Sequence, residues 1–145
     1  MNINELKTEL DKLNCTFFKP LLENADIWDY DDFSDRIIGG LKSADDYLLS
    51  DELRDVMAHI NEAAKRLDYL SRPIKGEYTI HQNSSGRFEC EAKEYTCGSK
   101  IEYYTRDDFD EKHKWFLSRV EHNGDQYFIV GSDVTLEGLR VRIRR

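Results

Sequence analysis

The chain has 145 residues, the size of one domain or of two small lobes, and is long enough to fold without disulfides or a metal. It carries a net charge of −8, and no apolar run approaches the roughly 18 residues that cross a bilayer, so we expect a soluble protein and no membrane partner. The cysteines, Cys15, Cys90 and Cys97, are an odd number in a chain without a signal-like apolar start, which predicts a reducing, cytoplasmic location.

The charge is distributed unevenly. Residues 1–72 hold 16 acidic and 9 basic residues, a net charge of −7, whereas residues 73–145 hold 13 acidic and 12 basic residues, a net charge of −1. An acidic lobe repels the phosphate backbone of nucleic acid and favours basic partners. Solubility alone also explains such an excess, so the charge leaves both explanations open.

The first half of the chain has helical patterns. Asn2 and Glu5 have the spacing of a capping box, and the apolar residues after them recur at intervals of three and four, which predicts a short amphipathic helix. Pro20 is expected to open a second short helix. Another helix is expected to run from Ile37 to Tyr47.

The clearest helix is predicted between Ser50 and Arg72. Ser50 is a natural N-cap, acidic residues follow it in the first turn, and the later apolar residues keep helical spacing. Pro73 forces the chain out of the helix, and the pattern then changes to that of strands. The sequence therefore predicts an acidic helical lobe over 1–72, a helical hairpin with short helices, and a second lobe over 73–145.

The second lobe is predicted to be a small antiparallel β domain, which makes the chain α+β. Strands are expected at Gly76–Gln82, Arg87–Ala92, Lys100–Thr105, Lys114–His122, Gln126–Gly131 and Leu139–Arg144. In the last of these strands, apolar residues alternate with arginines. Six short strands with tight turns predict a small barrel or a strongly curved sheet, SH3-like in scale.

Spaced motifs of this lobe resemble those of a known family. They are Gly86-Arg87-Phe88-Glu89, Cys97-Gly98, Trp115, Arg119-Val120-Glu121, Tyr127–Gly131 and Glu137–Ile143. Together they are similar to an uncharacterised small β domain of unknown function, found in Gram-positive bacteria and often on their phages, plasmids and integrative elements. The resemblance implies a compact β domain in a mobile-element context, and it brings no activity, substrate or catalytic residue.

The sequence contains no set of residues typical of an enzyme. Cys90 and Cys97 have histidines nearby in the sequence, but they are seven residues apart and lack the tight pair of a structural zinc site. The ordinary interpretation places Cys90 against the core and Cys97 at a turn, with the histidines on the surface. No phosphate-binding glycine loop or nucleophile elbow is present. We therefore expect no enzymatic activity, no metal and no cofactor.

Arginines of the last strand form the first candidate surface. Arg140, Arg142 and Arg144 point the same way, and Lys114 and Arg119 join them if their strand lies close, a pattern that suits contact with nucleic acid. The alternative is that the arginines pair with glutamates on neighbouring strands, for which the candidates are Glu102, Glu121 and Glu137. The net charge of −1 favours this pairing.

An acidic segment rich in aromatic residues, 26–35, forms the second candidate surface. Its candidate protein-binding residues are Asp26, Trp28, Asp29, Tyr30, Asp31, Asp32 and Asp35. Negative charge combined with aromatic anchors is a design by which proteins occupy basic, nucleic-acid-binding clefts. The alternative is that Trp28 and Phe33 pack between helices.

Two functions follow as hypotheses. The first is a non-catalytic accessory protein of a phage or other mobile element that binds a host protein, for example an anti-CRISPR inhibitor of a basic CRISPR effector. The second is a nucleic-acid-binding regulator that uses the C-terminal arginine face. A thiol or metal enzyme is a third possibility, with Cys97 as its nucleophile.

Overall fold

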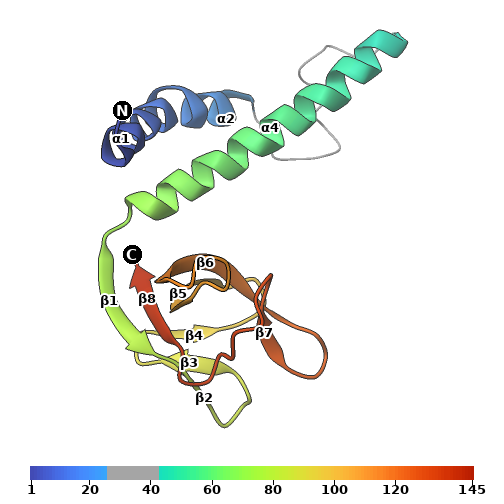
Figure 1. Cartoon of the computed structure of the whole chain (residues 1–145). Helices are drawn as coiled ribbons and strands as arrows, with labels where there is room; N and C mark the ends of the chain where they lie inside the picture. The colour runs from blue at the N-terminus through green and yellow to red at the C-terminus, as the bar shows by residue number, and fades with distance from the viewer. Residues whose placement is uncertain (26–42) are drawn as a thin grey trace. The chain divides into compact units, whose positions relative to one another are not determined.

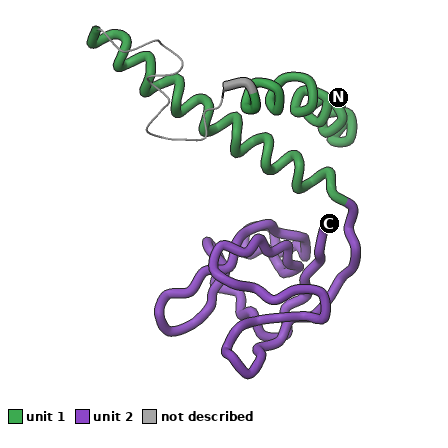
Figure 2. Tube along the Cα trace, turned by 180° about the vertical axis from the view of Figure 1, so that it is seen from behind, with its two compact units in different colours: residues 1–72 green, residues 73–145 purple. Residues whose placement is uncertain are grey.

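The computed structural model describes residues 1–25 and 43–145 (Figure 1). The chain divides into two compact units, Met1–Arg72 and Pro73–Arg145, which Figure 2 colours separately. The candidate protein-binding residues of the segment 26–35 lie outside the described residues.

The helical unit begins with three consecutive helical segments. They are α1 (Ile3–Leu13), the π-helix η1 (Asn14–Phe18) and α2 (Lys19–Ala25). The capping box is confirmed, because the Asn2 side chain accepts from the N–H of Glu5 at 3.0 Å and the Glu5 carboxylate accepts from the N–H of Asn2 at 2.8 Å. Pro20 is the second residue of α2, and Lys19 separates it from the last residue of η1.

The long helix α4 spans Ala44–Ser71, and the prediction of Ser50 as its N-cap is wrong. Ser43 caps the helix: its hydroxyl accepts from the N–H of Asp46 at 3.1 Å, and the Asp46 carboxylate accepts from the N–H of Ser43 at 3.0 Å. This reciprocal box satisfies two backbone donors that a helix start otherwise leaves open, so the helix begins two turns earlier and Ser50 is buried inside it. Tyr47, predicted at the end of a helix from Ile37, belongs to α4, whereas residues 37–42 of that prediction lie outside the described residues.

The β unit contains eight strands, all paired antiparallel. They are β1 (Ile74–Thr79), β2 (His81–Gln82), β3 (Phe88–Cys90), β4 (Lys93–Tyr95), β5 (Lys100–Arg106), β6 (His113–His122), β7 (Tyr127–Ile129) and β8 (Arg140–Arg144). One sheet has the order β1-β8-β5-β6-β7 and the other the order β2-β3-β4. The α+β class is confirmed, but the described residues form two sheets and no closed barrel, since β1 and β7 remain at the edges.

The predicted strand Gly76–Gln82 is divided at Ile80. Its first part, β1, pairs with β8, whereas β2 pairs with β3 through only two residue pairs. The N–H of Ile80 donates to Leu139 at 3.1 Å, and the N–H of Gly138 donates to the carbonyl of Ile80 at 2.9 Å. These bonds hold the chain at the corner where it passes from one sheet to the other.

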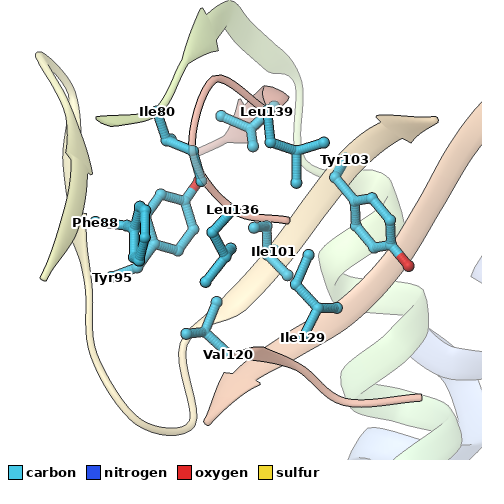
Figure 3. Close-up of a cluster of buried hydrophobic side chains, with 10 residues drawn as sticks. Ile80, Phe88, Tyr95, Ile101, Tyr103, Val120, Ile129, Leu136 and Leu139 are labelled. Carbon is cyan, nitrogen blue, oxygen red and sulfur yellow. The ribbon is translucent and has the colours of Figure 1, made fainter. Parts of the chain in front are cut away.

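Ten buried side chains form the core of the β unit, and Figure 3 shows them converging from both sheets. They are Ile80, Phe88, Tyr95, Ile101, Tyr103, Val120, Ile129, Leu136, Leu139 and Val141. The alternation predicted for the last strand is confirmed, because Leu139, Val141 and Ile143 are all buried. Each aliphatic side chain that is fully buried stabilises the unit by roughly 1.5–3 kcal/mol.

Candidate functional site

The arginines of β8 lie on the sheet face opposite the core, where they meet a buried carboxylate. Glu102 of β5 is directly paired with Arg142, and only 5% of its side chain is exposed. Its carboxylate accepts from Nε of Arg142 at 2.5 Å and from Nε of Arg144 at 2.9 Å. One carboxylate is therefore shared by two guanidinium groups, and the side chains of Arg142 and Arg144 are only 19% and 12% exposed.

These two arginines decide the ionisation of Glu102. Burial by itself raises the pKa of the Glu102 carboxyl, but the hydrogen bonds from Arg144 and Arg142 outweigh it and hold the pKa below its usual value. The charged form is thus the stable one in the folded protein. The three side chains form a structural ion cluster.

Aromatic rings extend this cluster towards β6. The guanidinium of Arg142 lies 4.4 Å from the centre of the Trp115 ring, and that of Arg140 lies 5.1 Å from the centre of the Tyr104 ring. The two rings are neighbours, with centroids 5.2 Å apart. Stacking of guanidinium groups on aromatic faces adds cation–π attraction and fixes the rotamers of the arginines.

All five residues predicted to bind nucleic acid have carboxylate partners. Arg142 and Arg144 share Glu102, and the others form the pairs Arg140–Glu77, Lys114–Asp107, Lys114–Asp110 and Arg119–Glu121. The Lys114 pairing is reciprocal: its hydrogen bond with Asp107 raises the pKa of Lys114 and lowers that of Asp107. Phosphate would therefore have to displace a carboxylate at each position.

Two of the three glutamates expected to pair with the β8 arginines have other partners. Glu121 bonds Arg119 of its own strand at 2.9 Å. Glu137 accepts from Nδ1 of His81 at 2.7 Å and from the N–H of Gln82 at 2.8 Å, and these bonds lower its pKa. The expected pairing therefore holds for Glu102, whereas Glu77, which the sequence did not single out, takes Arg140.

The cysteines lie where the ordinary interpretation puts them. Cys90 is half-buried and packs against the core of the β unit, whereas Cys15 and Cys97 are exposed, and all three are free thiols. Within residues 1–25 and 43–145, no three histidine, cysteine, aspartate or glutamate side chains are grouped so that they could hold a metal ion.

The helical unit exposes a large apolar surface. Among its described residues, three apolar side chains are buried, Leu22, Ala64 and Tyr69. The large exposed ones are Met1, Ile3, Leu6, Leu13, Phe17, Tyr47, Leu48, Leu49, Leu53, Val56 and Leu70. Exposed apolar side chains that share one helix face are candidates for contact with a partner.

The first half of α4 carries the clearest part of this surface, which we call the α4 stripe: Leu49, Leu53 and Val56. These residues are 53%, 38% and 51% exposed, and intervals of four and three place them on one face of the helix. Their helical spacing was visible in the sequence, but spacing shows which residues share a face and not whether another element covers it. No described helix of the protein is long and apolar enough to cross a membrane.

The comparisons with known proteins give one match, which covers the C-terminal half of the chain. Residues 78–143 match the model of DUF5348, a domain of unknown function. This match confirms the resemblance seen in the C-terminal half, while the Gram-positive and mobile-element context stays a prediction. A search of curated proteins and a search of solved structures each found no match. The helical unit, with the α4 stripe, lies outside the matched range.

Proposed function

We propose that the chain is a non-catalytic binding protein whose acidic helical unit binds a basic protein. In its most specific form, the protein is an accessory factor of a phage or mobile element that inhibits a host nucleic-acid-handling protein, such as a CRISPR effector. The observation that carries the proposal is the exposed α4 stripe on a unit with a net charge of −7.

Charge around the stripe supports a basic partner. The first half of α4 holds five carboxylates, those of Asp45, Asp46, Asp51, Glu52 and Asp55. Its one basic residue, Arg54, already forms an ion pair with Asp51. Carboxylates around an apolar stripe steer a positively charged surface to it, and the aliphatic side chains then supply the contact that slows release.

Site-specific crosslinking tests this proposal. One variant carries a photoreactive amino acid at Val56, and it is crosslinked in a lysate of Gram-positive cells. The control variant carries the same amino acid at Ala58, which is exposed on another face of α4. We expect the Val56 probe to capture a basic protein and the Ala58 probe to capture none. The amount captured should fall as the salt concentration rises, and capture should be lost when Leu49→Gln/Leu53→Gln is introduced. Both substitutions place a good helix former at an exposed position, so the fold is retained.

Three results contradict the proposal. Capture at both probe positions would show that the contact is non-specific. Capture that is insensitive to Leu49→Gln/Leu53→Gln would place the contact elsewhere. A product of two copies of the chain would show that the α4 stripe binds a second copy and not a basic partner.

A further inference from the structure

A groove lies on the β unit, away from the arginine cluster. It has a volume of about 960 Å³ and is formed by the turn between β2 and β3, the turn between β6 and β7, and residues 132–136. Phe88 and Leu136 are buried beneath it and Val134 packs on the same core, so its floor is partly apolar. Its lining also includes Tyr127 and Phe128 of β7.

β7 is an edge strand that borders this groove. It is last in the order β1-β8-β5-β6-β7, with β1 at the other edge of the sheet (Figure 1). In its pairing with β6, His122 lies opposite Tyr127 and Val120 lies opposite Ile129. An edge strand presents unpaired peptide groups to which another extended chain can bond.

The backbone bonds around β7 show which peptide groups point outward. The N–H of Asn123 donates to Gln126 at 3.2 Å and the N–H of Val130 donates to Arg119 at 3.0 Å, so residues 126, 128 and 130 direct their peptide groups towards β6. The N–H and C=O of Tyr127, between them, therefore face away from β6. The carbonyl of Ile129 confirms this alternation, because it accepts from Ser132 at 3.2 Å.

The charges at the groove favour a basic ligand. Asp125 and Asp133 line it, are exposed, and have no ion-pair partner among the described residues. Arg87, the basic residue of the lining, already bonds Glu94 at 2.8 Å. The groove thus offers two open carboxylates and no open guanidinium.

We propose that the groove binds an extended basic peptide, which adds to β7 as a further strand. The peptide backbone bonds the N–H and C=O of Tyr127, one row of its side chains rests on the floor formed by Phe88, Val134 and Leu136, and basic side chains reach Asp125 and Asp133. This site belongs to the β unit and stands independently of the function proposed for the helical unit.

A labelled peptide tests the site on the full chain. The probe is a fluorescein-tagged seven-residue peptide of alternating lysine and valine, and its control is the same peptide with all internal backbone nitrogens methylated, which keeps the charge and removes the donors. We expect fluorescence polarisation to show binding of the first peptide only. Equal binding of both peptides, or no binding of either, overturns the proposal.

Substitution of Tyr127 separates strand addition from side-chain contact. Tyr127→Pro removes the outward N–H at the first residue of an edge strand, a position that tolerates proline, whereas Tyr127→Ala removes the ring and keeps the N–H. We expect Tyr127→Pro to bind the peptide about tenfold more weakly than Tyr127→Ala, the effect of about one buried hydrogen bond. Equal affinities would contradict an added strand.

A charge variant keeps the test decisive if Tyr127→Pro does not fold. Asp125→Asn/Asp133→Asn removes the two groove carboxylates, and Glu91→Gln/Asp108→Asn makes the same change in net charge elsewhere on the β unit, outside the groove. We expect only the first pair to weaken binding, by several-fold, and Leu49→Gln/Leu53→Gln to leave it unchanged. Equal weakening by both pairs would show that binding is non-specific charge attraction.

Discussion

Glu102 and Arg142 face each other as directly paired residues of β5 and β8, and Nε of Arg142 donates to the Glu102 carboxylate at 2.5 Å. Arg144 donates to the same carboxylate, and Trp115 lies against the outer side of Arg142. A single glutamate therefore pairs with two arginines of the basic face of β8, and the three side chains form a structural ion cluster. This relationship determines what the β unit can do with its arginines.

Glu102→Gln is expected to destabilise the β unit by about 3 kcal/mol, because it removes the carboxylate charge that two largely buried arginine side chains share. Urea unfolding can be followed by the fluorescence of Trp115 in a Trp28→Phe background, which leaves one tryptophan in the chain. Glu121→Gln is the matched control, since its partner Arg119 is 59% exposed, and we expect a much smaller loss. Equal losses in the two variants would contradict a special role for Glu102.

Protonation of the Glu102 carboxylate should lower the stability of the β unit in acid. The folded pKa of Glu102 lies below its ordinary value of 4.5, so the unfolded chain takes up this proton first as the pH falls. The stabilisation by Glu102 is therefore complete at pH values above the pKa that this carboxyl has in the unfolded chain. It is lost as the pH falls through the lower pKa of the folded protein. Unfolding free energies measured between neutral pH and about pH 3 should show the difference between wild type and Glu102→Gln shrinking below 4.5. If the difference between the two proteins instead grew as the pH falls, stability would depend on pH in the opposite direction, and this mechanism would be excluded.

Nucleic-acid binding by the arginine face is expected to be absent. Each candidate cation already has a carboxylate partner, so little counterion release is available to drive association. Mobility assays with single- and double-stranded DNA and RNA at low salt should show no retarded complex. A complex that weakens with salt, and weakens more in Arg140→Gln than in the helix control Lys65→Gln, would instead establish the regulator hypothesis.

Local patterns were sufficient to predict much of the fold. The three-residue spacing of Asn2 and Glu5 and the alternation along β8 each depend on neighbours in the chain, and the structure has both. The start of α4 was missed although its signal is equally local. Ser43 has a carboxylate three residues later, at Asp46, whereas the third residue after Ser50 is Leu53, so the capping-box rule applied to both serines selects the correct one.

Contacts that depend on strand order could not be predicted from spacing. β8 lies between β1 and β5, which is why Arg140 meets Glu77 and why Arg142 meets Glu102. The bond between His81 and Glu137 joins residues 56 positions apart, which the corner at Ile80 brings together. Strand β4 has only three residues and owes its conformation to pairing with β3. The groove beside β7 likewise results from the assembly of three distant segments.

The two cysteines of the β unit are expected to respond differently to the same change. Cys90 packs half-buried against the core, so Cys90→Ser places a hydroxyl in an apolar setting and should cost roughly 1 kcal/mol of stability. Cys97 is exposed before Gly98, so Cys97→Ser should change the free energy of unfolding by less than about 0.5 kcal/mol. Urea unfolding of both variants measures this difference. If Cys97→Ser instead abolished an activity of the chain while leaving its stability intact, the exposed thiol would be a nucleophile, and the proposal of a non-catalytic protein would be wrong.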